Sequence, residues 1–320
     1  MIDLKKENLK KIWTILRIVV GVSLILFLLW RLDINKILSN IGSLDVRYLL
    51  YALIPYFFFI FVSAWRWQIL LNFKKFNIPF GKTLMIYFIA IFFNNFLPTV
   101  VGGDVMRVLY SMKRERKADA LATVLVDRML GFVGLFIFAL IAVLSLLIQE
   151  RQSEFLPLMI IGLIVIVLMT YMFFSERIYS LFSPTVARIK IFKLGERLNR
   201  LHETATDFGG AWGPITLCIF SSMIIQALLA LAPFFVLRSM GNFELGILPF
   251  FIYLPIINVI SMIPISFNAW GVRENAYVLL FSRVGLSGET SLTVSVVSAF
   301  LVLLFSIIGG IIFTFYKREQ

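Results

Sequence analysis

Two arginines that follow a proline and a turn-forming stretch are the residues of this sequence best suited to bind an anion. Arg107 comes nine residues after Pro98, and Arg273 comes nine residues after Pro264. Each proline ends an apolar run, because proline interrupts the hydrogen bonding of a helix. A guanidinium group can hold a phosphate through two parallel hydrogen bonds. The pattern therefore predicts two related sites for a phosphate or a similar anion.

Small and polar residues near each arginine suit the same chemistry. Gly102 and Gly103 permit a sharp turn, after which Asp104 can cap a short helix. In the second stretch Asn268 is the expected cap and Gly271 provides the turn. The exposed N–H groups at the start of a helix attract anions. The predicted substrate-binding residues are Asn95, Gly102, Gly103, Arg107, Asn268, Gly271 and Arg273.

Four further charged residues lie close to these breaks or inside an apolar segment. Asp127 and Arg128 lie about nine residues into a long apolar run, or about 13 Å along a helix. An unpaired charge near the membrane centre costs about 2.5–3.5 kcal/mol or more. We therefore expect a charge network of Asp104, Asp127, Arg128 and Glu274, in which Asp127 pairs with Arg107 and Glu274 pairs with Arg128. The alternative is that these ion pairs only hold the two breaks in place.

The composition is that of a membrane protein. Hydrophobic residues make up 60% of the 320 residues, and the chain contains 33 Phe. Soluble domains average about 45–50% apolar residues. Several apolar runs are long enough to cross a hydrocarbon core of about 30 Å. The net charge of +12 fits basic loops that face anionic lipid, so it is a poor argument for nucleic-acid binding.

Three other features carry less weight for function. Cys218 and His202 are the single cysteine and histidine, so a disulfide within the chain is impossible and a metal site is not expected. No cofactor and no catalytic residue is predicted. The stretch Trp65-Arg66-Trp67 is expected to anchor a span at the membrane interface, or else to contact a lipid headgroup.

Six full membrane spans and two short hairpins must position these residues. The short apolar runs that end at the two prolines are predicted to enter the membrane and return on the same side, as re-entrant hairpins at 83–112 and 247–282. With this topology 20 lysines and arginines face one side and six face the other, which places both termini in the cytoplasm. If both runs crossed fully, the chain would have eight or more spans and a weaker charge bias. The expected spans are 13–30, 48–71, 118–148, 155–174, 212–237 and 291–316.

The two halves of the chain share one order of elements. Residues 1–148 and 155–320 each contain a span, a span, a hairpin and a span, and the second half starts from the opposite face. The predicted fold class is therefore an all-α polytopic membrane protein, with one transmembrane domain over 1–320 built from inverted repeats. Transporters of this kind bind substrate at broken helices near the membrane centre. We expect the two hairpins to meet there around a water-accessible cationic pocket, although chance similarity of the two breaks is the alternative.

Four ordered motifs resemble those of a known family. They look like the signatures of the lysylphosphatidylglycerol synthase transmembrane region, also called the flippase-like or YbhN-type (UPF0104) membrane family, and the resemblance covers nearly the whole chain. Asp104 and Asp127 stand where glutamate is frequent in that family, and Ala269 stands where glycine is frequent. The motifs are Asn95-Phe96-Leu97-Pro98, Gly103-Asp104-Val105-Met106-Arg107, Asp127-Arg128 and Trp270-Gly271-Val272-Arg273-Glu274.

This resemblance implies lipid transport at the cell membrane. In the best-known members the region moves aminoacylated phosphatidylglycerol to the outer leaflet, which gives resistance to cationic antimicrobial peptides. Those members carry a soluble synthase domain, and this sequence is expected to be a stand-alone member without it. We expect a transporter, not an enzyme, that moves aminoacyl-phosphatidylglycerol, another anionic phospholipid or a polyprenyl-phosphate carrier. The alternatives are a membrane-embedded lipid-modifying transferase and a non-catalytic partner of a separate lipid synthase. The expected partners are anionic or phosphate-bearing membrane lipids, and a separate lipid synthase and a second copy of the chain are further candidates.

Overall fold

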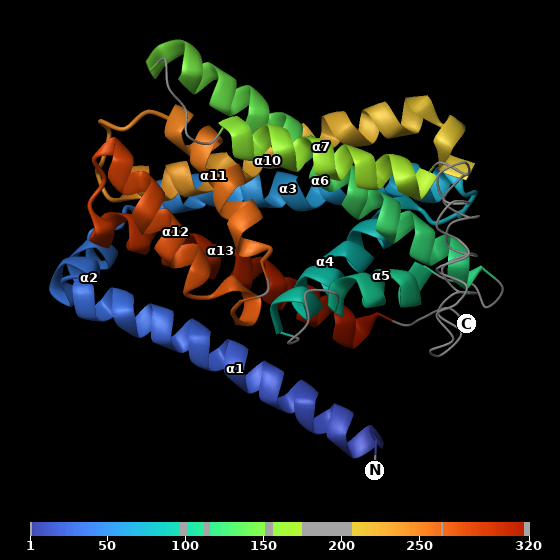
Figure 1. The fold of residues 1–320 in the computed structure, drawn as a ribbon, viewed down its shortest axis with the longest axis horizontal. Coiled ribbons are helices and arrows are strands. Elements are labelled where there is room, and N and C mark those ends of the chain that lie inside the picture. Colours follow the sequence, from blue (N-terminus) through green and yellow to red (C-terminus); the bar gives the residue numbers. More distant parts are fainter. Residues whose placement is uncertain are drawn as a thin grey trace. The chain divides into compact units, whose positions relative to one another are not determined.

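The chain folds into helices, which the computed structural model describes over residues 2–96, 102–111, 116–150, 156–174, 207–263 and 265–316 (Figure 1). Pro98, Pro264 and His202, which the sequence singled out, lie outside these ranges. The α-helices are α1 (Ile2–Arg31), α2 (Ile34–Gly42), α3 (Val46–Phe73), α4 (Phe80–Phe96), α5 (Gly102–Ser111), α6 (Lys117–Glu150), α7 (Leu156–Phe174), α10 (Trp212–Ser239), α11 (Leu248–Ser261), α12 (Val272–Phe281) and α13 (Gly288–Phe315). The described residues also include the short 3-10 helices η2 (Asp207–Gly210), η3 (Phe267–Ala269) and η4 (Ser282–Val284).

Within the described residues, four helices are long and apolar enough to cross a membrane. They are α3, most of α6, α10 and α13, and the end of α1 together with α2 raises the number to five if that bent pair forms one span. The protein is therefore a multi-pass membrane protein. Six full spans remain a prediction, for which the 19-residue helix α7 is the further candidate.

The two predicted breaks are confirmed as ends of helices. α4 ends at Phe96 and α11 ends at Ser261, in each case shortly before the proline of the break. Other prolines, Pro55 and Pro233 among them, lie inside long helices without ending them. Neighbouring residues in a membrane protein can satisfy the backbone groups that such a proline leaves unpaired.

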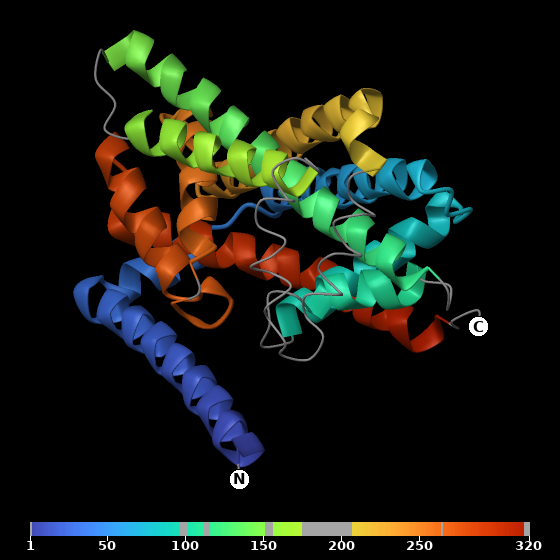
Figure 2. The same cartoon turned by 45° about the vertical axis from the view of Figure 1, so that its right-hand side comes forward.

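The helices before and after each break contact one another, and α11 and α12 can be followed in orange in Figure 2. In the second hairpin Phe250, near the start of α11, packs on Phe281 at the end of α12, with ring centroids 4.7 Å apart. In the first hairpin Tyr87 of α4 lies 5.1 Å from the guanidinium of Arg107 in α5. The helical hairpins are thus present, whereas their depth in a membrane and the inverted repeats remain predictions.

The chain divides into two compact units, which are described separately. Unit 1 holds α1, α2 and the α11–α12 hairpin, and unit 2 holds most of α3 together with α5 and α6. The core of unit 2 includes a cluster around the fully buried Trp67, to which α3, α4 and α6 contribute. Unit 1 comprises Met1–Phe58, Ile91–Gly102 and Ala227–Ile308, and unit 2 comprises Phe59–Ala90, Gly103–Gln226 and Gly309–Gln320.

Candidate functional site

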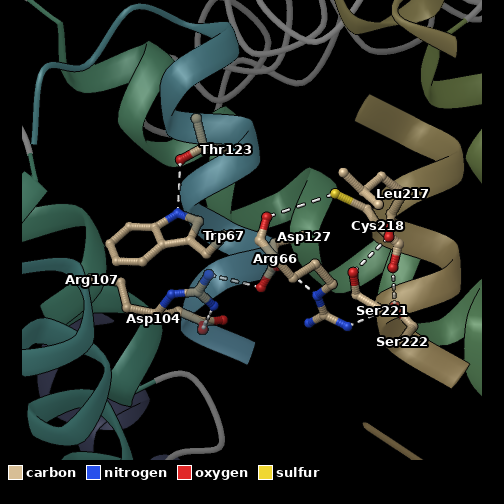
Figure 3. A network of polar contacts seen from close by, with 10 residues as sticks. All are labelled: Arg66, Trp67, Asp104, Arg107, Thr123, Asp127, Leu217, Cys218, Ser221 and Ser222. Atoms are coloured by element: carbon tan, nitrogen blue, oxygen red, sulfur yellow. Dashed lines mark hydrogen bonds and ion pairs between the residues drawn. The ribbon is translucent and has the colours of Figure 1, made fainter. Parts of the chain in front are cut away.

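Asp127 in unit 2 is a buried carboxylate that binds two arginines (Figure 3). Its Oδ1 accepts a hydrogen bond from Nε of Arg66 at 2.7 Å, and its Oδ2 accepts one from Nη2 of Arg107 at 2.7 Å. Arg66 comes from α3, Arg107 from α5 and Asp127 from α6. The predicted pairing of Asp127 with Arg107 is present, and the carboxylate ties three helices together.

The prediction that Arg66 lies at the membrane interface is wrong. This residue was expected to anchor a span at the membrane interface, but both Arg66 and Trp67 are buried in the interior of unit 2. A second guanidinium nitrogen, Nη1, donates to Oγ of Ser222 in α10 at 2.8 Å. The position of Arg66 along its helix could have indicated this burial, because α3 continues for seven residues after Arg66 before ending at Phe73. A charge placed that far into an apolar helix needs a partner.

Two glycines of α6 make room for this arrangement. A Cβ atom on Gly131 would lie 3.2 Å from Nη1 of Arg66, so the guanidinium occupies space that any larger residue would take. A Cβ on Gly134 would lie 2.3 Å from Cβ of Ser222, which is closer than real Cβ contacts. Small residues of this kind allow membrane helices to approach one another closely. The packing of α6 on α10 therefore places the Ser222 hydroxyl against Arg66.

Arg107 is enclosed by aromatic rings as well as by carboxylates. The centre of its guanidinium lies 4.4 Å from the centroid of the Trp67 ring and 5.1 Å from that of Tyr87. Trp67 is itself held by a hydrogen bond from its Nε1 to Oγ1 of Thr123 at 3.2 Å. Cation–π contacts of this kind contribute about 2 kcal/mol when desolvated. Arg107 is only 4% exposed, and its buried Nε has no hydrogen-bond partner among the described residues.

The network continues from Arg107 to a partly exposed arginine. Asp104 approaches Nη1 of Arg107 at 3.5 Å and also forms an ion pair with Arg128, whose side chain is 31% exposed. Asp104 lies within the first turn of α5, which begins at Gly102, and is not the residue before the helix. Arg128, Asp104, Arg107, Asp127 and Arg66 thus form a chain of alternating charges. Among the residues that the structure describes, the ion pairs of this network join three guanidinium groups and two carboxylates.

The second hairpin, in unit 1, holds its arginine by a local contact. Oε1 of Glu274 accepts hydrogen bonds from Nη2 of Arg273 at 2.7 Å and from Nε at 3.1 Å, and Oε2 accepts one from the Gly271 N–H at 2.6 Å. Glu274 thus pairs with Arg273 within unit 1, and its predicted pairing with Arg128, which belongs to unit 2, remains a prediction. Glu274 is the third residue of α12, from which its side chain reaches the free N–H group at the helix start. The Arg273 side chain is 26% exposed and lies 5.1 Å from the Trp270 ring.

The tip of the second hairpin has an unusual backbone. Asn268 and Ala269 adopt positive φ angles of 48° and 58°, and Gly271 adopts 82°. The residue that caps α12 is Gly271, so the prediction that Asn268 caps the helix is wrong. A Cβ on Gly271 would lie 2.6 Å from the backbone oxygen of Gly21 in α1. Glycine at this position therefore allows the tip to rest directly on the backbone of α1.

The other predicted substrate-binding residues lie among contacts that stabilise the fold. The amide of Asn95 donates to Oγ of Ser306 in α13 at 2.6 Å, within unit 1. Gly102 and Gly103 are the buried first residues of α5. Arg107 and Arg273 belong to different units, so a pocket shared by both hairpins remains a prediction. In the part of the chain that the structure describes, no group of three or more His, Cys, Asp and Glu residues could hold a metal ion.

Comparison with known proteins identifies the family of this chain. The sequence pattern of the family described as "Lysylphosphatidylglycerol synthase TM region" matches residues 14–310, a range that contains both hairpins and the whole charge network. The chain belongs to the lysylphosphatidylglycerol synthase TM region family. This agrees with the resemblance carried by the four sequence motifs.

Two curated relatives of this lysylphosphatidylglycerol synthase TM region protein come from archaea. UPF0104 membrane protein PH1989 of Pyrococcus horikoshii is 27% identical over 323 aligned residues, which cover 93% of this chain and 95% of the relative. A UPF0104 membrane protein of Methanothermobacter thermautotrophicus is 25% identical over 284 residues, covering 80% of this chain and 79% of the relative. No solved structure matches the chain.

Proposed function

We propose that this protein moves a phosphate-bearing lipid between the two leaflets of the cell membrane, as a flippase-like transporter. The observation that carries the proposal is the gathering of three guanidinium groups, those of Arg66, Arg107 and Arg128, around two carboxylates in unit 2. A guanidinium can hold a phosphate through two parallel hydrogen bonds, so an anion that enters this region would find partners there. A lipid headgroup with a phosphate supplies that anion, while its acyl or prenyl tail stays in the hydrocarbon.

Arg273 is the guanidinium that we propose meets the headgroup first. Its side chain is partly exposed, and the neighbouring Trp270 ring orients the guanidinium plane. Its carboxylate partner Glu274 also accepts a hydrogen bond from the Gly271 N–H. Arg273 can therefore turn toward a phosphate without leaving the carboxylate of Glu274 entirely unpaired. Two hydrogen bonds from its planar group would then fix the phosphate.

Arg107 is the second proposed ligand, and it requires a local rearrangement. The shorter of its two carboxylate contacts, to Asp127 at 2.7 Å, would stay in place. The longer contact, to Asp104 at 3.5 Å, would be replaced by the phosphate. Asp104 keeps its ion pair with Arg128 during this exchange. The cost is then a change of partner and not the exposure of a bare charge to hydrocarbon.

Candidate lipids are aminoacyl-phosphatidylglycerol, other anionic phospholipids and polyprenyl-phosphate carriers. All share a phosphodiester or phosphate anion, which is the only group that the two arginines would recognise. The proposal therefore includes a preference for anionic over uncharged lipid. Both termini are proposed to face the cytoplasm, since 20 of the loop lysines and arginines would then lie on that side.

The test is lipid translocation by the purified protein in liposomes. Acyl-labelled fluorescent phosphatidylglycerol and an equally labelled uncharged glycosyldiacylglycerol, whose sugar headgroup keeps it from crossing unaided, would be placed in both leaflets, and an impermeant quencher would report the fraction that reaches the outer leaflet. The proposal expects protein-dependent movement of phosphatidylglycerol and much slower movement of the uncharged glycolipid. Movement no faster than in protein-free vesicles for all anionic lipids would overturn it. A lipid product of altered mass would instead identify a transferase.

A further inference from the structure

α2 is a short helix with an apolar face that no other part of the described chain covers. Ile34, Leu38 and Ile41 are 51%, 60% and 42% exposed, and none of the nine residues of α2 is buried. At 3.6 residues per turn these three side chains fall within an arc of about 60° on one face of the helix. Asn35, Lys36 and Ser39 lie on the opposite face. The helix is therefore amphipathic, with its apolar face turned outward.

The position of α2 beside α1 indicates what lies against that face. The end of α1 and α2 form a corner of 92°, so α2 runs at right angles to a helix whose apolar surface suits the membrane interior (Figure 1). Trp30, immediately before the corner, is 84% exposed, and tryptophan is enriched where membrane meets water. If α1 crosses the bilayer, α2 lies in the plane of its surface.

Several contacts fix this corner within unit 1. The carboxylate of Asp33 accepts hydrogen bonds from the N–H groups of Asn35 at 2.9 Å and Lys36 at 3.4 Å, which starts the helix. The N–H of Asp33 donates to Oε1 of Glu289 at the start of α13, at 3.4 Å. A hollow of about 320 Å³, whose lining includes Asn40, Asn242 and Glu244, lies beside the helix away from its apolar face. The partly buried residues of α2 are Ile37 and Asn40, so the helix rests on the protein along one edge and both its apolar face and its polar face are exposed.

We propose that α2 is a membrane-surface helix, whose Ile34, Leu38 and Ile41 enter the headgroup and upper acyl region of the leaflet reached by the C-terminal end of α1. The occupant is lipid and not a second protein, because the adjoining end of α1 is also apolar and exposed, with Leu26, Phe27 and Trp30 59%, 47% and 84% exposed. Amphipathic helices of this kind bury their apolar face about 5–10 Å into the interface. α2 would hold the C-terminal end of α1 at a fixed depth in the membrane, independently of any transport activity.

The test uses an environment-sensitive fluorophore at single cysteines in a full-length Cys218→Ala background. The label is placed at Leu38→Cys on the apolar face and, as a matched control, at Ser39→Cys on the polar face. Both residues are exposed, so neither change removes a buried contact. The proteins are reconstituted in vesicles of phosphatidylcholine and phosphatidylglycerol. Quenchers are then supplied as nitroxide groups on the lipids or as iodide in the water.

The proposal expects several-fold stronger quenching of the Leu38→Cys label by lipid nitroxides than of the Ser39→Cys label, and the reverse order with iodide. Equal quenching of both labels by iodide would overturn it, because the apolar face would then lie in water. Protection of the Leu38→Cys label from both quenchers would also overturn it, since a protein partner would then cover the helix. Size-exclusion chromatography of each labelled protein confirms that it is folded.

Discussion

The two arginine-bearing hairpins use similar sequence spacing in different ways. In the α4–α5 hairpin Arg107 is buried between two rings and bound to Asp127, a carboxylate from a separate helix. In the α11–α12 hairpin Arg273 is partly exposed and bound to Glu274, the next residue in the chain. The first arginine is therefore part of a tertiary network, and the second is held by local structure.

This difference indicates that Arg107 and Arg273, which the sequence spacing suggested are equivalent, have different roles. A charge paired across helices contributes to holding those helices together, and removing its partner leaves a buried charge uncompensated. A charge paired with its neighbour on a partly exposed surface can exchange that partner for water or for a ligand at small cost. The comparison therefore predicts large effects on folding in the first hairpin and larger effects on transport in the second.

The largest expected effect is the loss of stability in Asp127→Ala. This change leaves Arg66 and Arg107 buried without their shared carboxylate. We expect the free energy of unfolding to fall by about 3–5 kcal/mol. The measurement is unfolding in mixed micelles by titration with sodium dodecyl sulfate, followed by tryptophan fluorescence. A loss below about 1 kcal/mol, the value typical of exposed ion pairs, would contradict the buried network.

Gly271→Ala tests whether the second hairpin depends on contact with α1. The new Cβ would meet the Gly21 oxygen at 2.6 Å, and the residue would keep a positive φ angle of 82°. We expect a loss of about 2–4 kcal/mol from steric overlap and backbone strain together. Gly285→Ala is the matched control, because Gly285 has the same φ angle and no atom near the Cβ position. Equal losses in the two variants would show that the contact with α1 adds nothing.

Glu274→Ala is expected to be milder than Asp127→Ala. It removes one hydrogen bond at the start of α12 and the ion pair of a partly exposed arginine. Since Arg273 can then be solvated by water, the expected loss is about 1–2 kcal/mol in the same unfolding titration. A loss as large as that of Asp127→Ala would remove the distinction between the two hairpins.

The smallest effect, and a stabilising one, is expected for Ala269→Gly. Ala269 has a φ angle of 58°, a conformation that costs an L-residue about 1–2 kcal/mol and glycine almost nothing. The greater freedom of glycine in the unfolded chain offsets part of this gain, so the net stabilisation is up to about 1 kcal/mol. Ala276→Gly, inside α12, should have the opposite sign. Destabilisation by Ala269→Gly would show that the strain at this position is absent.

The sequence predicted the helical hairpins because their signals are local. Proline and glycine restrict or free the backbone at the residue where they stand, so the ends of α4 and α11 could be placed to within a few residues. The pairing of Asp127 with Arg107 was also predictable, because the apolar segments contain few charged residues and each of them therefore has few candidates of opposite charge.

The rest of the site depends on tertiary packing, which spacing does not encode. Arg66 has the flanking tryptophans of an interfacial anchor, and only the packing of α3 against α6 and α10 shows that it is buried. The local bond of Glu274 to the Gly271 N–H was not predicted, because it needs the exact start of α12 to be known. Helix boundaries are the least reliable part of a sequence-based prediction.

The central claim, that an accessible arginine receives a lipid phosphate, is tested most directly by the translocation rate of labelled phosphatidylglycerol with Arg273→Gln. The control is Arg47→Gln, which removes an exposed arginine that also pairs with a nearby carboxylate, Asp45. The account predicts at least about a tenfold lower rate for Arg273→Gln, the loss expected when a charge-assisted hydrogen bond worth about 1.5–3 kcal/mol is removed. It predicts an unchanged rate for Arg47→Gln. Wild-type rates in both variants, with both proteins folded, would contradict it.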